Sequence, residues 1–145
     1  MFEECLRKQG LIKELFANCK TEEDKYKKIM DLGRQQPAFS NEYKIPENII
    51  QGCQSIMYIH AFLKEGNVIF ETNSDALISS GLAVLMLKIY SGEAPEVILK
   101  CPPACLEELG INASLTPSRS NGLYSIHLRM KQEALKLLLE SQRRE

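Results

Sequence analysis

The stretch of residues 76–90 constrains the fold of this chain more than any other, because it is apolar nearly all round. It follows Ser74 and Asp75, two residue types that are favoured where helices begin. A helix without a polar face is stable only when it is buried. We therefore predict that residues 76–90 form a helix inside the protein.

Helical spacing of apolar residues marks three further segments. The first is residues 6–19. The second begins at Thr21, whose hydroxyl can accept hydrogen bonds from free N–H groups, and it is broken by Pro37. In the last, apolar residues recur at short helical intervals: Leu123, Ile126, Met130, Ala134, Leu137 and Leu138. We interpret residues 116–122 as a segment that leads into this last helix.

Between the helical segments lies a pattern typical of a β-hairpin. Residues 56–63 and 68–72 are rich in β-branched and aromatic side chains, and residues 64–67 supply a turn. Ile49 and Ile50, just ahead, could belong to a further strand. The pattern thus predicts at least one antiparallel pair of strands.

The order of these segments predicts an α+β fold, with a small three-stranded antiparallel sheet flanked by helices. A length of 145 residues is typical of one domain, so we expect residues 1–145 to form a single domain. Cys53 would then lie at a strand connection, where the chain turns over the sheet.

Composition argues against several classes of protein. The net charge is −1 and acids and bases are interspersed, which predicts neither a basic face for nucleic acid nor an acidic tail. The longest apolar run, residues 81–87, is far shorter than the roughly 20 residues of a membrane helix. The acidic N-terminus lacks the apolar run of a secretory signal. Five cysteines, an odd number, argue against a disulfide framework, so we expect a reducing, cytoplasmic setting.

Cys53 is the cysteine whose neighbours best suit a reactive thiol. Gly52 leaves room for a tight turn or for a partner, and Gln54 and Ser55 can hydrogen-bond a sulfur species. A thiol acts as a nucleophile only as its thiolate, which nearby positive charge stabilises, and Arg119 is the best candidate for such a cation. The alternative is a small buried hydrophobic residue, since free cysteine is among the most buried residue types.

The other cysteines fit less reactive roles. Cys5 and Cys19 lie at helical spacing and are interpreted as packing residues. Cys101 and Cys105 form a pair, but zinc sites usually combine two such pairs, and this chain has no second one. A metal-ligand role and a facultative disulfide both remain open for this pair.

No enzyme motif accompanies Cys53. A cysteine–histidine hydrolase would need His60 or His127 beside the thiol with a third orienting group. The chain contains no nucleophile-elbow, phosphate-loop, dinucleotide or zinc-protease motif. A self-sufficient enzyme is therefore the least expected class. Asp75 is interpreted either as an acid at a helix start or as a surface acid that meets a partner.

Three blocks of sequence together resemble the SufE family of sulfur-acceptor proteins. The first is the run from Ile50 to Ser55, the second is Ser74-Asp75-Ala76 with its apolar helix containing Gly81, and the third runs from Leu115 to Leu123. They occur in the family's order and spacing, and the resemblance extends over nearly the whole chain, from the early helices to the last one. One departure is Met57-Tyr58, where many relatives have a tryptophan.

The resemblance implies the fold of the iron–sulfur scaffold IscU, an α+β domain with a small antiparallel sheet. It also implies that Cys53 accepts sulfur from the persulfide of a SufS-type cysteine desulfurase, stimulates that enzyme, and passes the sulfur on to an iron–sulfur scaffold complex. Pyridoxal phosphate would belong to the desulfurase, and no bound cofactor or metal is expected in this chain.

Under this hypothesis a mobile Cys53 loop and a docking face surround the thiol. The residues expected to support the sulfur or meet the partner are Gln51, Gly52, Gln54, Ser55, Asp75 and Arg119. Two other classes stay open: an IscU-like metal or cluster scaffold that uses Cys53, Cys101 and Cys105, and a protein-binding adaptor in which Cys53 is structural.

Overall fold

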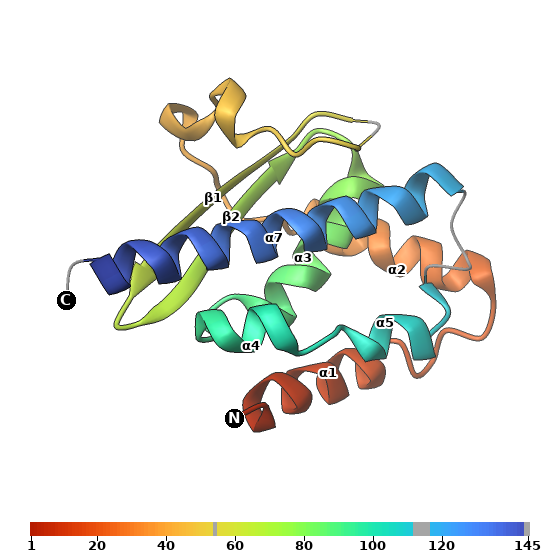
Figure 1. The fold of residues 1–145 in the computed structure, drawn as a ribbon. Helices are drawn as coiled ribbons and strands as arrows, with labels where there is room; N and C mark the ends of the chain where they lie inside the picture. The colour runs from red at the N-terminus through yellow and green to blue at the C-terminus, as the bar shows by residue number, and fades with distance from the viewer. Residues whose placement is uncertain (54, 112–116, 144–145) are drawn as a thin grey trace.

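The computed structural model describes residues 1–53, 55–111 and 117–143, and for residues 117–122 it describes the backbone alone. Helices at both ends of the chain enclose one β-hairpin (Figure 1). The elements in chain order are α1 (Glu3–Leu15), α2 (Glu22–Arg34), the short 3-10 helices η1 (Asn41–Tyr43) and η2 (Pro46–Asn48), β1 (Met57–Lys64), β2 (Asn67–Ser74), α3 (Leu77–Tyr90), α4 (Pro95–Lys100), α5 (Ala104–Glu108) and α7 (Pro117–Arg143).

Helix α3 is the centre of the fold, as its sequence predicts. Nearly all of its side chains are buried, including the polar Ser79 and Ser80. It contacts α1, α2, α7 and β2, and Figure 1 shows α7 crossing in front of it. Because α3 is held on several sides, a side chain attached to it has little freedom to move.

Helices α2 and α3 approach each other through two glycines. A Cβ atom built on Gly81 would overlap the carbonyl oxygen of Ile29, and one built on Gly33 would overlap that of Leu77. Any larger residue at either position would push the helices apart. The role of Gly81 in the sequence pattern is therefore structural.

The hairpin is confirmed, but the predicted third strand is wrong for the described residues. β1 and β2 pair antiparallel from Met57↔Ser74 to Lys64↔Asn67. Ile49 forms only an isolated bridge with Tyr58. The segment stays short because the η2 helix ends just before it and the chain turns just after it, which leaves too few extended residues for a strand.

The helix starts partly match their predictions. The Thr21 Oγ1 atom accepts a hydrogen bond from the Asp24 N–H at 3.0 Å, as a capping residue does. Ser74 is instead the last residue of β2, and its Oγ accepts from the Ala76 N–H at 3.3 Å, outside α3. Asp75 is exposed and does not cap α3, whose N-cap residue has no side-chain hydrogen bond.

Helix α7 is longer than predicted. It starts at Pro117, so most of the segment interpreted as its lead-in already belongs to it. Proline is well suited to the first position of a helix, where its missing N–H is not needed. The predicted core positions Leu123, Ile126, Met130 and Ala134 are buried.

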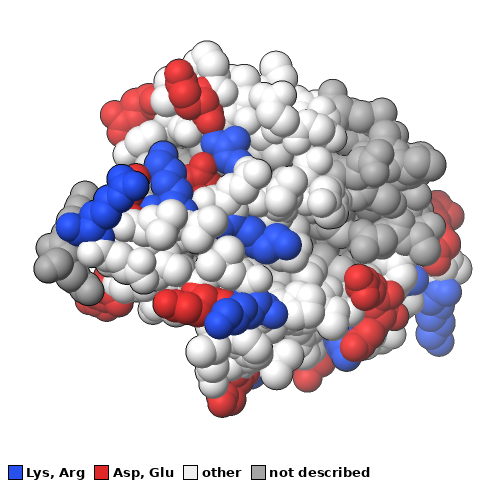
Figure 2. Space-filling view, viewed as in Figure 1, with Lys and Arg blue, Asp and Glu red and all other residues white. Residues whose placement is uncertain are grey.

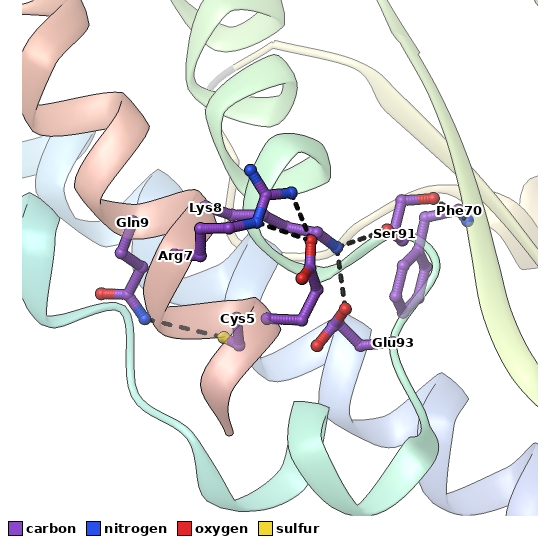
Figure 3. Close-up of polar contacts among 8 residues, drawn as sticks. Cys5, Arg7, Lys8, Gln9, Phe70, Ser91 and Glu93 are labelled. Atoms are coloured by element: carbon purple, nitrogen blue, oxygen red, sulfur yellow. Dashed lines mark hydrogen bonds and ion pairs between the residues drawn. The ribbon is translucent and has the colours of Figure 1, made fainter. Parts of the chain in front are cut away.

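Helix α1 is anchored to the rest of the domain by polar side chains (Figure 3). The Lys8 ammonium donates to the Ser91 carbonyl at 3.2 Å and forms an ion pair with Glu93 at 2.8 Å, where the Glu93 side chain is only 7% exposed. Ser91 in turn accepts a hydrogen bond from the Phe70 N–H at 3.0 Å. These contacts connect α1, the end of α3 and β2.

On the face shown in Figure 2, acidic and basic side chains are interspersed among uncharged ones. Within the described residues, none of the helices combines the length and apolar character needed to cross a membrane.

Candidate functional site

Cys53 lies on a short loop that enters the hairpin, and the structure describes its residues 51–53 and 55–56. The Ile50 N–H donates to the Met57 carbonyl at 2.8 Å and closes the base of this loop. Ile50 is buried at the base, whereas Gln51 and Gly52 are exposed. Cys53 is half-buried and packs against the hydrophobic core. The loop therefore holds its thiol at the boundary between the core and solvent.

Gly52 combines a special backbone angle with a close contact. Its φ is +89°, in the region that favours glycine. A Cβ atom built on it would overlap the hydroxyl of Ser125, on α7. Gly52 thus provides the tight turn that its sequence position suggested, and it lies close to α7. The approach of a partner protein at Gly52 stays a prediction.

Ser55, on the other side of Cys53, is connected to α3. Its Oγ lies 2.7 Å from the Oγ of Ser79, a hydrogen-bond distance. Ser79 is 6% exposed and belongs to the buried central helix. Ser55 therefore lies against a rigid part of the fold, a contact that sequence reasoning did not predict.

Arg129 of α7 holds the segment that leads into the loop. Its guanidinium donates to the carbonyls of Ile49 at 3.0 Å and Glu47 at 2.6 Å. The Glu133 carboxylate, one turn further along α7, accepts from the Arg129 Nε at 2.9 Å. Sequence reasoning missed Arg129, because a helical arginine beside a glutamate four residues on is usually a surface ion pair.

The protonation state of Cys53 is set by its burial. Removal of the sulfur from water raises the pKa of the Cys53 thiol above its usual range. The resting thiol is therefore largely protonated and a weak nucleophile. The side chains of two expected helpers, Gln54 and Arg119, lie outside the described residues, so their roles stay predictions; Arg119 itself falls on α7.

Asp75 lies at the same end of the hairpin as the Cys53 loop. The register pairs Met57, which follows the loop, with Ser74, which precedes Asp75. Gln36 holds Ser74 on both sides: its Nε2 donates to the Ser74 carbonyl at 2.9 Å, and its Oε1 accepts from the Ser74 N–H at 3.2 Å. Two of the sequence blocks thus meet at one end of the sheet, and Asp75 is exposed there.

Three other cysteines lie in the core, away from solvent. Cys5, Cys101 and Cys105 are 0%, 3% and 1% exposed. The Gln9 amide lies between them, donating to the sulfurs of Cys5 and Cys101 at 3.7 and 3.8 Å and accepting from the Cys105 N–H at 3.0 Å. Figure 3 shows the Gln9–Cys5 contact. Burial raises the pKa of Cys5 to about 12 and that of Cys105 to about 11.

This arrangement does not form the metal site considered from sequence. In the described residues, no three histidine, cysteine, aspartate or glutamate side chains are placed to hold a metal ion. Cys53, Cys101 and Cys105 therefore do not make a ligand set in this structure. Cys101 and Cys105 are not joined by a disulfide, so the facultative bond considered from sequence is not formed in this structure.

The two histidines serve packing. The ring of His60 stacks on that of Tyr43 with centroids 3.6 Å apart, and its Nδ1 lies 3.0 Å from a Glu71 carboxylate oxygen. The ring of His127 stacks on that of Tyr90, and its buried Nε2 has no hydrogen-bond partner among the described residues. Neither histidine hydrogen-bonds Cys53, so the pair that a cysteine–histidine hydrolase requires is not formed by these side chains.

Comparison with known proteins identifies the class of this domain. The family model of SufE, described as the Fe-S metabolism associated domain, matches residues 11–134. This α+β domain, with its half-buried cysteine beside a hairpin, therefore matches a family that is described by its association with Fe-S metabolism. The chain belongs to the SufE family.

Two relatives support this assignment. SufE-like protein 1, chloroplastic/mitochondrial, of Arabidopsis thaliana is 35% identical over 127 residues, which are 87% of this chain and 34% of that protein. An uncharacterized SufE-like protein of Synechocystis is 35% identical over 124 residues, 86% of this chain and 78% of that protein. This chain therefore spans about a third of the length of the Arabidopsis relative.

The fold recurs in a hypothetical protein from Thermus thermophilus, known from a solution structure. The TM-score is 0.74 at 24% identity, and the match covers 91% of this chain and 96% of that one. At this identity the likeness supports the α+β fold.

Proposed function

We propose that this chain accepts sulfur from the persulfide of a cysteine desulfurase onto Cys53, stimulates that enzyme and delivers the sulfur for iron–sulfur cluster assembly. The single observation that carries the proposal is the half-burial of Cys53 on a loop of a SufE-family domain. A SufS-type desulfurase, which holds its own pyridoxal phosphate, is the donor. An iron–sulfur scaffold complex is the recipient.

The transfer is an exchange at sulfur. The Cys53 thiolate attacks the outer sulfur of the donor persulfide, the sulfur–sulfur bond of the donor breaks, and the donor cysteine leaves as its thiolate. The outer sulfur, now bonded to Cys53, carries the persulfide proton or the corresponding negative charge. The step needs no external oxidant or reductant, because one sulfur–sulfur bond replaces another.

The half-burial of Cys53 protects a persulfide bound there, and it also makes the resting thiol a weaker nucleophile. A persulfide in open solvent would be lost to other thiols and to oxidants. Apolar neighbours shield the sulfur from them, and the same neighbours raise the pKa of Cys53. Efficient uptake therefore requires that the docked desulfurase draws Cys53 outward or brings positive charge to it.

The three core thiols do not compete for the sulfur. Cys5, Cys101 and Cys105 have almost no exposed surface, so a donor persulfide cannot reach them. Cys19 is half-buried, but its Sγ donates to the Asp24 carbonyl at 3.7 Å, at the start of α2. Access thus leaves Cys53 and Cys19 as the thiols that a donor can reach, and Cys19 is the thiol to compare Cys53 with.

The test is the intact mass of the protein after incubation with a cysteine desulfurase and L-cysteine, followed by mapping of the added sulfur. The expected result is one extra sulfur atom on Cys53, which the variant Cys53→Ser loses and the variant Cys19→Ser keeps. Extra sulfur on the Cys53→Ser variant, or none on the wild-type chain, would overturn the proposal.

A further inference from the structure

We propose that the outer face of α7 is a docking site for an acidic amphipathic helix of a partner protein. The surface consists of an apolar row on this helix, here called the α7 stripe: Tyr124, Leu128, Leu135 and Leu139. The proposal concerns binding alone, and it does not depend on sulfur transfer at Cys53.

The spacing of the α7 stripe places its four side chains on one side of the helix. Leu128 follows Tyr124 by four residues, Leu135 comes seven residues later, and Leu139 follows after four more. At about 1.5 Å per residue the stripe is about 22 Å long. The core residues of α7 lie on the opposite side: Leu123, Ile126, Met130 and Ala134.

The α7 stripe is open to solvent. Its side chains range from 38% exposed at Leu128 to 68% at Tyr124. A shallow depression lies between Leu135 and Leu139. In Figure 2, uncharged side chains cover the middle of α7 and basic ones lie beside them. Single exposed apolar side chains are common on protein surfaces, whereas a row of them with a polar border is typical of an interaction site.

The charged residues along the α7 stripe are mostly basic. The depression is bordered by four polar side chains: Gln132, Lys136, Glu140 and Arg143. Within the part of the chain that the structure describes, neither Lys136 nor Arg143 forms an ion pair, whereas Arg129 is paired with Glu133 at 2.9 Å. Two basic side chains and one acidic one thus border the depression, which favours a partner of negative charge.

The geometry of the α7 stripe favours a helical partner. Leu128 and Leu135 lie seven residues apart, the repeat with which two helices pack along a shared seam. A partner helix with apolar residues at intervals of three and four would cover the stripe along its length. Acidic residues on the borders of that helix would meet Lys136 and Arg143.

Lys131 distinguishes such a partner from a second copy of this chain. It lies three residues after Leu128 and four before Leu135, close to the centre of the stripe, and it is half-buried. Two copies packed stripe against stripe, parallel or antiparallel, would bring their Lys131 side chains together. A carboxylate on a different helix would pair with Lys131 instead.

The experiment measures the binding of two fluorescein-labelled synthetic peptides to the isolated full chain by fluorescence anisotropy. Both peptides contain three heptads with leucine at the two core positions. One has glutamate at the bordering positions and the other has lysine, so that like charges keep each peptide from pairing with itself. The glutamate peptide binds the wild-type chain at least roughly tenfold more tightly than the lysine peptide, and added salt reduces this difference.

Three variants test the α7 stripe itself. Leu135→Asp and Leu139→Asp each weaken binding of the glutamate peptide roughly tenfold or more, because each replaces an apolar contact by a like charge. Leu6→Asp, at a position 56% exposed on α1, is the matched control and leaves binding unchanged. The double charge reversal Lys131→Glu with Lys136→Glu exchanges the preference, so that the lysine peptide binds more tightly.

Several results would overturn the proposal. One is equal binding of the two peptides to the wild-type chain, and another is equal weakening by Leu6→Asp. A dimer in sedimentation that Leu135→Asp dissociates would assign the stripe to a second copy. Binding to phosphatidylserine vesicles that Leu135→Asp abolishes would assign it to a membrane surface. Peptide binding is measured without a desulfurase, so this proposal and the proposed function fail separately.

Discussion

Two groups of thiols in this molecule differ in their surroundings. Cys53 lies on a short loop with part of its surface in solvent, whereas Cys5, Cys101 and Cys105 surround the Gln9 amide inside the core. Burial raises the pKa of Cys53 and also that of Cys5 and of Cys105, so acidity alone does not distinguish the proposed carrier thiol from these two core thiols. What distinguishes them is access: a loop can move its sulfur outward, and a packed helix cannot.

The largest expected effect comes from removing the sulfur atom of Cys53. Cys53→Ser abolishes persulfide formation and the stimulation of the desulfurase, because the serine hydroxyl is not a nucleophile at neutral pH. Cys101→Ser and Cys105→Ser keep both activities if they fold. Sulfur labelling with L-cysteine and the desulfurase measures uptake, and thermal unfolding checks that each variant is folded. Loss of uptake in a folded Cys101→Ser variant would contradict the division between the two thiol groups.

A substitution among the buried thiols is expected to change the free energy of unfolding instead of sulfur uptake. Gln9→Ala leaves the Cys105 N–H and the Pro102 carbonyl without their present partner, and unsatisfied buried groups cost about 1–3 kcal/mol each. The free energy of unfolding, measured in urea, falls by that order, while the native alkylation rate of Cys53 stays unchanged. A faster Cys53 reaction in this variant would show that the two regions are coupled.

A smaller stability effect is expected at the loop. Gly52→Ala forces a side chain into a positive-φ position, which costs about 1–2 kcal/mol, and brings its Cβ against Ser125. The loop is expected to shift away from α7, so Cys53 alkylation accelerates. The double variant Gly52→Ala with Ser125→Ala recovers part of the stability, since it removes the clash and keeps the backbone strain. No recovery would mean that Ser125 does not limit this position.

The smallest effect concerns the pH dependence of stability. Burial lowers the pKa of His127 to about 4, from an ordinary value near 6.5. The unfolded chain therefore binds a proton between these values that the folded chain does not. The stability associated with neutral His127 is present above about pH 6.5 and is lost as the pH falls towards 4. His127→Phe, which keeps a ring against Tyr90, shows a smaller loss than the wild-type chain over this window in urea titrations at each pH. Equal slopes would contradict the lowered pKa.

Much of the fold follows from local patterns. The apolar stretch before Tyr90 predicted a buried helix, Thr21 predicted a helix start, and residues 56–72 predicted a hairpin; all three are present. These predictions succeed because burial and capping depend on residues that are close in sequence. The third strand was wrong, since the turn at Gly52 cuts the Ile49 segment short before it can pair further.

The candidate site was predicted only in part. Cys53, Gly52 and Ser55 are neighbours in sequence, and a family resemblance was enough to select them. Ser79, Ser125 and Arg129 were missed, because nothing in their own surroundings marks them: two are helical serines and one is an arginine beside a glutamate. Their importance comes from a loop that is distant in sequence and close in space.

By itself, the sequence determined which thiol is the candidate carrier, which segment is buried and where the helices and the hairpin lie. The tertiary structure decided how that thiol is held. Packing brought α3 against Ser55 and α7 against Gly52, and it drew Cys5, Cys101 and Cys105 around Gln9 in the core. The physical reason is that the reactivity of a thiol depends on its access to solvent, and access is set by contacts between segments far apart in the chain.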